Sequence, residues 1–502
     1  RSQRRDVVEV APLGLSLDQD FGWMTANWRR HVFPKDWGVD REGWMQRRYF
    51  ELSVLFQIKD ELKSGDLFIP GGERYDDYRE ELVDEGTFQE ELASYGEVSG
   101  IATEPAIFIQ TLREQLRTKC REVDARFPEN AHADIVDGRL ILRKLPRTEL
   151  SKVIALVDSL ITERLPETSI VDVLVDATSW VELTRHFRPL AGTEARVRDL
   201  HHRVVTTLFC YGCNLGPTQT ARSVRGFSRR QTAWLNLKYV TEDTLQRATV
   251  DTINLYNKFE LPGYWGSGKS ASADGTKWSV YEQNLLSEYH IRYGGIGYYH
   301  VSDKYIALFS RFIPCGAYEA IYILDGLIEN RSEIRPDTVH GDTQAQNFPV
   351  FGLAHLLGIE LMPRIRNIKD LALSRPDPQV SYPHIQALFG DGSIDWNLIE
   401  THLHDMLRVA VSIKTGKISA STILRRLGNY SRKNKLYFAF KELGRVIRTL
   451  FLLRYIDDVE VRKTIQAATN KSEEFNNFTK WAFFGGQGII AENVLHEQEQ
   501  IV

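Results

Sequence analysis

Two aspartates in this chain are candidates for binding a cation that takes part in phosphate chemistry. Asp274 ends the run of small residues Ser270-Ala-Ser-Ala-Asp274, and Asp342 ends the stretch that begins at Arg335. If the two lie side by side, their ionised carboxylates repel each other unless a cation bridges them. Two hard divalent ions roughly 3.5–4 Å apart can activate the attacking oxygen and stabilise the leaving oxygen of a phosphodiester. The pair therefore predicts metal-dependent phosphodiester chemistry, provided that the fold brings both residues together.

A third carboxylate is available in the segment Asn470-Lys-Ser-Glu473. The residues alone leave two interpretations of it open. Glu473 stands three residues after Asn470, which is the spacing of a capping box at the start of a helix, and this interpretation is favoured over a metal ligand. The adjacent Glu474 is a competing candidate for the ligand.

The elements around the aspartates predict the fold that positions them. Strands are expected at 270–280, 294–301, 304–313, 335–342 and 359–365, with helices at 318–327 and 351–357. Three strands, a helix, and then alternating strand and helix follow the order of a ribonuclease-H-like core, an α/β fold with a mixed five-stranded sheet and helices. In that core the first and fourth strands are neighbours, so Asp274 and Asp342 are expected side by side at their ends.

The 502 residues are too many for a single core, so several domains are expected. A mainly helical scaffold region is expected over 1–195, a helical unit leading into the core over 196–262, and the first part of the core over 263–370. A helical insertion over 371–465 interrupts the core, and 466–502 holds the helix with the third carboxylate. Because the polar ending has no obvious domain-closing element, we expect the chain to stop inside a larger protein.

The second half of the insertion is strongly basic, and its only acid between 425 and 454 is Glu442. Such a cluster repels itself unless a polyanion neutralises it, and aromatic residues are interleaved with the charges, so we expect nucleic-acid contact here. Phosphate contact is assigned to Arg364, Arg366, Arg425, Arg426, Arg432, Lys433, Lys435, Arg445 and Arg448.

A second basic face is expected in the helical unit. Gly216-Pro217 opens one helix and Ser228 caps the next, so the two resemble a helix-turn-helix. Its basic residues are Arg222, Arg225, Arg229 and Arg230. Helix pairs of this kind are common structural elements, so a packing role is favoured over sequence-specific DNA recognition.

Composition excludes several other classes of protein. The net charge of −4 does not indicate a polyanion partner for the chain as a whole, and there is no apolar run long enough for a membrane span. The four cysteines are too few for a disulfide framework, which favours the cytoplasm, and the pair Cys210 and Cys213 is expected to be buried and apolar in character. Gly263–Ser270 formally matches a P-loop, but a helix is predicted before it where a P-loop needs a strand, so no nucleotide cofactor is expected.

Taken together, the chain resembles the Tn3-family transposases. Ser270–Trp278 resembles the first strand of their DDE motif, and Gly341-Asp342-Thr-Gln-Ala-Gln346 resembles the second. Residues 424–434 and 442–455 resemble the basic insertion of the family, and Asn470-Lys-Ser-Glu473 resembles its Asn-Lys-Gly-Glu, with serine in place of glycine. The match runs in order from about Arg47 to near the C-terminus. Family members are typically much longer and carry N-terminal domains that bind the transposon end repeats.

The resemblance implies a function. Asp274, Asp342 and Glu473 would bind two Mg²⁺ ions, for which Mn²⁺ can substitute, and would catalyse 3′-end cleavage and strand transfer in replicative, cointegrate-forming transposition. The expected partners are DNA, namely the terminal inverted repeats and the target, and further copies of the chain in at least a dimer. A catalytically inactive DNA-binding remnant or regulator of a transposase is the alternative, and a metal nuclease without joining activity is a third.

Overall fold

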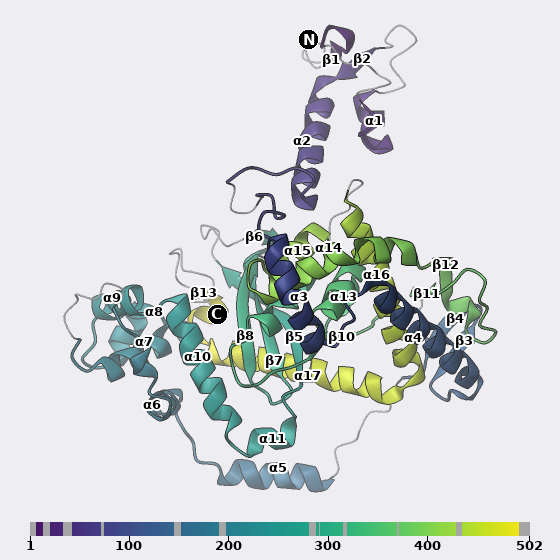
Figure 1. Cartoon of the computed structure of the whole chain (residues 1–502). Coiled ribbons are helices and arrows are strands. Elements are labelled where there is room, and N and C mark those ends of the chain that lie inside the picture. Colours follow the sequence, from purple (N-terminus) through teal and green to yellow (C-terminus); the bar gives the residue numbers. More distant parts are fainter. Residues whose placement is uncertain are drawn as a thin grey trace.

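The computed structural model describes residues 7–13, 21–33, 43–71, 75–144, 152–189, 197–280, 288–290, 292–314, 319–368, 371–427 and 434–490. Within these residues a mixed β-sheet lies at the centre, and helices cover both of its faces (Figure 1). No helix in the described ranges is both long enough and apolar enough to cross a membrane.

The central sheet has seven strands in the described part of the chain. They are β5 (Ser270–Val280), β6 (Glu288–His290), β7 (Arg292–Ser302), β8 (Ala307–Pro314), β9 (Thr338–Gly341), β10 (Glu360–Pro363) and β13 (Ile489–Ile490). Five of them run in the order β10-β9-β5-β7-β8, with β9 and β10 parallel to β5 and to each other. These are the five predicted strands, and the first and fourth are neighbours, as expected. The short strands β6 and β13 were not predicted.

The predicted helix at 318–327 is wrong as a single element. Two short pieces stand there instead, η7 (Glu319–Tyr322) and α12 (Asp325–Ile328). Between them the carbonyl of Ile323 accepts a hydrogen bond from Nε2 of the buried His300, 2.8 Å away. This bond takes the place of the backbone hydrogen bond that the carbonyl would accept in a continuous helix. His300 of β7, which is distant in sequence, therefore breaks the helix.

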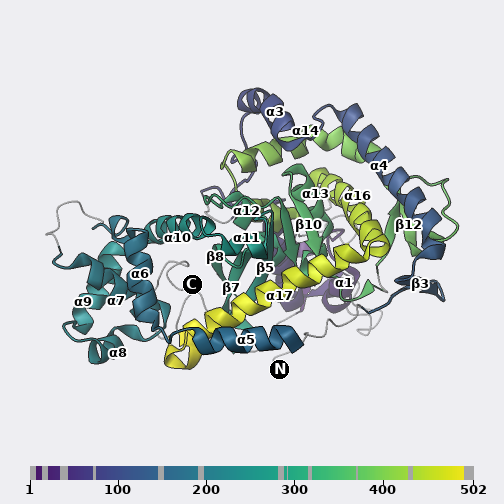
Figure 2. The same ribbon diagram turned by 90° about the horizontal axis from the view of Figure 1, so that it is seen from below.

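Helix α17 (Val459–Ala482) crosses one face of the sheet, which Figure 2 shows from below. Aromatic pairs hold it there: Phe475 contacts Tyr299 of β7, and Phe483 contacts Trp278 of β5, with ring centroids 5.4 Å and 4.8 Å apart. Helix α13 (Phe348–Leu356) covers the other face.

The insertion packs on α13 rather than standing apart. It contains β11 (Leu373–Arg375), β12 (Phe389–Ser393), α14 (Trp396–Lys414), α15 (Ala420–Leu427) and α16 (Lys435–Asp457). Gly444 of α16 lies so close to the carbonyl of Phe348 that a Cβ would overlap it. A Cβ on Gly352 would lie only 2.8 Å from the carbonyl oxygen of Phe440. The two glycines thus allow α16 to lie directly against α13.

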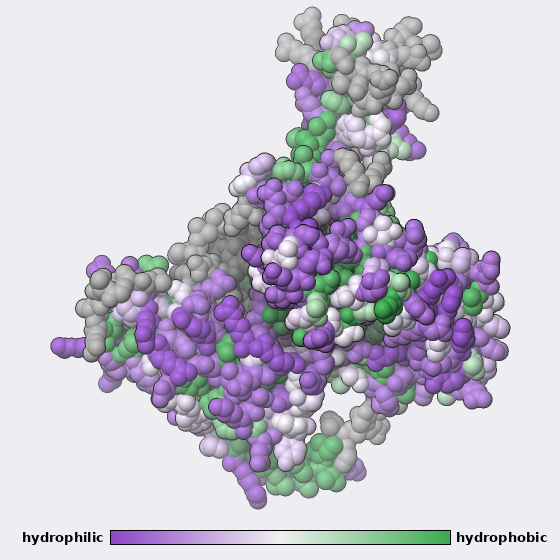
Figure 3. All heavy atoms as spheres, in the orientation of Figure 1, coloured by the Kyte–Doolittle hydropathy of each residue, from purple (hydrophilic) through white to green (hydrophobic). Residues whose placement is uncertain are grey.

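Part of the N-terminal region shares this core. Helices α3 (Glu85–Ser99) and α4 (Pro105–Arg126) belong to the same buried cluster as the insertion. So does the hairpin of β3 (Ala133–Val136) and β4 (Arg139–Leu142), which turns at Asp137-Gly138. The chain before them, with β1 (Val7–Glu9), α1 (Ala26–Val32), β2 (Trp44–Gln46) and α2 (Arg47–Ser64), projects upward in Figure 1. Helix α5 (Lys152–Arg164) has no buried residue, and its apolar side chains form a green patch at the bottom of Figure 3.

The helical unit has a core of its own, to which α7 (Leu200–Gly212), α9 (Arg229–Tyr239) and α10 (Glu242–Asn257) contribute. Helices α6 (Ile170–Trp180) and α8 (Gly216–Ser223) pack against α7. The predicted cap is confirmed, since Ser228 and Gln231 form a capping box at the start of α9. Cys210 and Cys213 are buried, as expected. The P-loop-like segment runs from α11 (Leu261–Trp265) into β5, so a helix precedes it and a strand follows, which is the reverse of a P-loop.

Candidate active site

The register of two parallel strands places the aspartates at the same level. Ser272 of β5 lies opposite His340 of β9, so Asp274 and Asp342 each follow their paired residue by two positions. Side chains alternate along a strand, and Ser272 and His340 line a small cavity beneath α17. Asp274 therefore faces α17, and Asp342 lies just past the end of β9.

Each aspartate is fixed by hydrogen bonds. Asp274 accepts from the backbone N–H of Gly275 at 3.0 Å and from Nδ2 of Asn476 in α17 at 2.9 Å. Asp342 accepts from the backbone N–H of Gln344 at 2.9 Å and so caps the short helix η8 (Thr343–Gln346). Both carboxylates thus have a defined orientation before any ligand binds.

Glu473 lies in the interior of α17, so its interpretation as a capping-box residue is wrong. The helix begins eleven residues before Asn470, at Val459, where Asp458 accepts a hydrogen bond from the N–H of Glu460 and serves as the N-cap. Glu473 precedes Asn476 by three residues, which places both on the same side of the helix. Its side chain is 60% exposed, and its Oε1 lies 3.8 Å from Nη1 of Arg364.

The neighbouring Glu474 points elsewhere. It lies beside Tyr305, in the turn after β7, and its charge helps to raise the pKa of that tyrosine, which burial raises in the first place. Glu473, in contrast, is close enough to Asp274 to raise the pKa of that aspartate. Of the two glutamates, the structure brings Glu473 toward the aspartates.

The site accumulates negative charge. Burial raises the pKa of Asp274, and the charges of Asp342 and Glu473 raise it further, against the hydrogen bond from Gly275. Burial likewise raises the pKa of Asp342. A further acid, Glu319 of η7, belongs to the same group: burial, and then the charges of Asp342 and Asp274, raise its pKa to about 7.

The donors fit a hard divalent cation in kind, because all are carboxylate oxygens. The carboxylates lie farther apart than the ligands that surround a bound metal ion. In the part of the chain that the structure describes, no three His, Cys, Asp or Glu side chains converge closely enough to hold a metal ion. The structure therefore brings Asp274 and Asp342 together and leaves Glu473 near them, turned toward Arg364.

The basic residues assigned to phosphate contact fall into two groups. In the first, the guanidinium is engaged within the protein. Arg426 is buried and donates to the carbonyl of Leu62, and Arg445 donates to both oxygens of Glu442, at 2.9 Å and 2.8 Å. Burial raises the pKa of Asp325, and the half-buried Arg425 lies close enough for its charge to oppose that rise.

The second group lies near the carboxylates or in solvent. Arg366 is exposed, and its charge lowers the pKa of Asp342 against the effect of burial. Lys435 is exposed in the first turn of α16. Arg448 packs 4.8 Å from the ring of Phe348 and lines a cavity of about 290 Å³ with Lys441 and Asn347, directly after η8. Arg432 and Lys433 lie outside the described residues.

Three residues of this region were not predicted from the sequence. Asn476 had a usable signal, since it stands one helical turn after Glu473. Lys471 donates to the carbonyls of Trp265 and Asp303, at 2.8 Å and 2.5 Å, and so ties α17 to the entry of β5 and to the turn after β7. Glu319 had no signal, because only the fold brings it to the aspartates.

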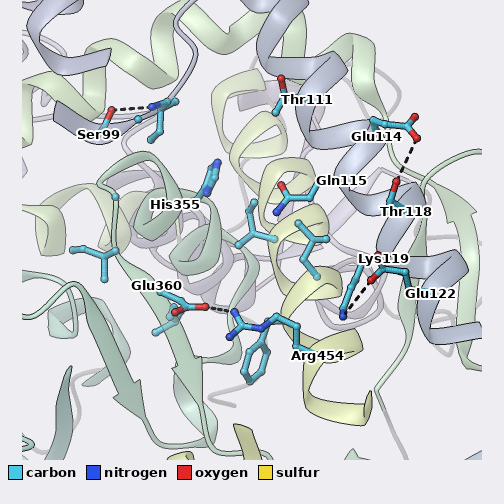
Figure 4. A pocket seen from close by; sticks show the side chains of 18 residues that line it. Ser99, Thr111, Glu114, Gln115, Thr118, Lys119, Glu122, His355, Glu360 and Arg454 are labelled. Carbon is cyan, nitrogen blue, oxygen red and sulfur yellow. Dashed lines mark hydrogen bonds and ion pairs between the residues drawn. The ribbon is translucent and has the colours of Figure 1, made fainter. Parts of the chain in front are cut away.

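A larger cavity, of about 840 Å³, lies between α4, α13 and α16 (Figure 4). Its wall includes His355 and two ion pairs, Arg454 with Glu360 and Lys119 with Glu122. None of the acidic residues of the candidate site lines it. Size alone therefore does not indicate the active site.

Comparison with known proteins identifies the family. The model of the Tn3 transposase DDE domain matches residues 172–502, so the chain belongs to the Tn3 transposase family. It is 28% identical over 487 residues to the transposase for transposon Tn1546 of Enterococcus faecium, covering 96% of this chain and 48% of that protein. It is 30% identical to the transposase for transposon Tn501 of Pseudomonas aeruginosa over 466 residues, covering 90% of this chain and 46% of that protein. For the transposase for transposon Tn21 of Escherichia coli, the identity is 30% over 492 residues, covering 96% and 49%. The chain spans about half the length of these curated relatives.

Proposed function

We propose that this chain is the catalytic part of a metal-dependent DNA transposase, which cleaves the 3′ ends of a Tn3-like element and joins them to target DNA. The observation that carries the proposal is the register of β5 and β9, which sets Asp274 level with Asp342 beneath the helix of Glu473. The family match supports it. The strand order β10-β9-β5-β7-β8 supports the assignment of a ribonuclease-H-like core.

In this proposal Asp274, Asp342 and Glu473 hold two Mg²⁺ ions, or Mn²⁺ in their place. The bound ions would supply activation of a water or a 3′-hydroxyl and neutralisation of charge on the phosphate. Asn476 keeps one oxygen of Asp274 turned toward α17. Arg364 lies 3.8 Å from Glu473, and a bound cation would replace it as the countercharge if Glu473 turned toward the aspartates.

DNA contact is proposed for the basic residues that face the site or the solvent. Arg366 and Lys435 are exposed, and Arg448 lines the cavity next to η8 together with Lys441. Phosphate groups held there would lie close to Asp342. The proposed partners are the terminal inverted repeats, the target DNA and further copies of the chain, in at least a dimer that forms cointegrates by replicative transposition.

The test is a Mg²⁺-dependent assay with the purified chain and two DNA substrates. One carries an uncut end repeat and reports nicking, and the other carries a pre-cut 3′-hydroxyl and reports joining. Asp342→Asn should lose both reactions while DNA binding, measured by gel shift, is retained. If this variant still joins the pre-cut end, the assignment of the site is wrong.

The alternative is a DNA-binding remnant or regulator that does not catalyse. One observation favours it: Glu473 lies near Arg364, and the described residues do not close a three-ligand site. The same two substrates separate the alternatives. Binding without nicking or joining by the unmodified chain supports the remnant, and nicking without joining supports a nuclease.

A further inference from the structure

We propose that Glu319 is a fourth cation-binding carboxylate of the site, beside Asp274 and Asp342. This inference rests on the proposed function, since it adds a ligand to the same metal site. Three features of the site support it: the fit of η7 against the two aspartate strands, the partners of the acids around it, and an unsatisfied oxygen of Asn476.

The segment that begins with Glu319 spans both aspartate strands. Its carboxylate lies against Gly275, the residue after Asp274, so closely that a Cβ on Gly275 would overlap Oε2. Four residues later, Ile323 lies against Gly341, the residue before Asp342, with Cδ1 2.6 Å from where a Cβ would stand. Two glycines that flank the two aspartates thus leave the room for this segment. The carboxylate of Glu319 is thereby brought next to the residue that follows Asp274, at the level where β9 ends and β5 continues.

Nearby acids have partners within the protein, whereas none is found for Glu319 among the residues that the structure describes. Asp325 and Glu329 both pair with Arg311, at 3.0 Å and 3.2 Å. No described residue donates a hydrogen bond to the side chain of Glu319 or forms an ion pair with it. A half-buried carboxylate is costly without a countercharge, and a cation shared with the aspartates would provide one.

An independent observation points to a ligand on the other side of Asp274. Asn476 is only 7% exposed, and while its Nδ2 donates to Asp274, its Oδ1 has no partner among the described residues. Buried polar atoms are nearly always satisfied, so an orphaned oxygen next to a carboxylate marks the place of a cation or of a water bound to one. Oxygen donors therefore flank Asp274 on both sides.

The plainer alternative is that Glu319 is a neutral acid that only fills space. The two alternatives differ in Mn²⁺ affinity, which can be measured without DNA and without turnover from the EPR signal of free Mn²⁺. We expect Glu319→Gln, which keeps the shape of the side chain, to weaken binding about tenfold, or ~1.4 kcal/mol. Asp342→Asn should weaken it at least as much. The matched control Glu474→Gln removes the same charge beside Tyr305 and should stay within about twofold.

The outcomes are distinct. If Asp342→Asn loses affinity and Glu319→Gln binds Mn²⁺ like the unmodified chain, Glu319 is a packing residue and the proposed function stands. If neither variant changes the affinity, the metal site itself is wrong and both proposals fall. A measurement on the unmodified chain covers the case in which Glu319→Gln does not fold. With Fe²⁺, ascorbate and peroxide, backbone cleavage should occur near Glu319 as well as near Asp274 and Asp342, and cleavage at the aspartates alone contradicts the proposal.

Discussion

The carboxylate site and the basic insertion differ in whether their charged groups have partners within the protein. At the sheet, Asp274, Asp342 and Glu319 are partly buried next to one another, and the pKa of each is raised. In the insertion, Arg426 and Arg445 have carbonyl and carboxylate partners within the protein. The sheet concentrates acidic groups, whereas several guanidinium groups of the insertion already have partners within the protein.

This difference shows why an unbalanced count of charges is weak evidence for a binding surface. The cluster between 425 and 454 has one acid in its own sequence window, but Arg454 pairs with Glu360 and Arg426 bonds to Leu62, both far outside it. The informative charges are those that remain without a partner after folding. By this criterion the sheet site carries the stronger evidence for a ligand.

The largest expected effect is on catalysis at the sheet. Asp274→Asn should reduce strand transfer by about 10³-fold or more, or ~4 kcal/mol, because it removes a charged ligand from the site. In EDTA the same variant should be no less stable than the unmodified chain, since it relieves repulsion. Arg454→Ala, which breaks an exposed pair, is the control and should change transfer by less than about threefold. Equal losses in the two variants would remove the contrast between the regions.

In the insertion the expected effect is on stability. Arg426→Ala should lower the free energy of unfolding by about 3 kcal/mol, because it leaves the carbonyl of Leu62 and its surroundings without a buried donor. Urea unfolding followed by circular dichroism measures this. A variant of normal stability that binds DNA poorly would mean that Arg426 serves phosphate and not the fold.

The sheet should also respond to acid. Burial lowers the pKa of His300 from its usual value near 6.5 to about 4. The unfolded chain takes up a proton below about pH 6.5 and the folded chain does not, so stability falls as the pH drops from about 6.5 toward about 4. Between about pH 7.5 and about pH 5, this one residue accounts for ~2 kcal/mol. His300→Gln should reduce the acid-dependent loss by that amount in urea titrations at the two pH values, and an unchanged loss would contradict the assignment.

The smallest expected effects are on DNA affinity. Lys435→Ala and Arg366→Ala should each weaken binding about threefold to tenfold and lower the salt dependence by about one phosphate contact. The measurement is fluorescence anisotropy with end-repeat DNA at several salt concentrations. Arg445→Ala should leave the salt slope unchanged, since its guanidinium is held by Glu442. A larger drop in slope for Arg445→Ala than for Lys435→Ala would reverse the grouping of the basic residues.

Much of the sheet was predictable because its signals are local. Strand β5 has the bounds predicted for it, and the parallel neighbours β5 and β9 follow from the order of the elements. The break at Ile323 was not predictable, because it depends on a hydrogen bond from His300. Contacts between distant segments override local helix propensity at such points.

The site, like the sheet, was predictable only in part. Asp342 lies just past the end of β9, as expected, but Asp274 lies inside β5 and not at its end, because β5 continues to Val280. The N-cap predicted at Asn470 is wrong because the polar helix α17 already begins at Val459. The role of Glu473 was implied by the family resemblance and stays a proposal. Glu319 reaches the site only through η7, and the segment around it carries no motif that indicates a ligand.

Metal binding by the two aspartates is tested most directly with a crystal of the chain grown with Mn²⁺ and measured at a wavelength where manganese scatters anomalously. A peak is expected in the anomalous map between Asp274 and Asp342, with Glu473 turned away from Arg364 toward it. The absence of a peak there, at a Mn²⁺ concentration that supports strand transfer, would contradict it.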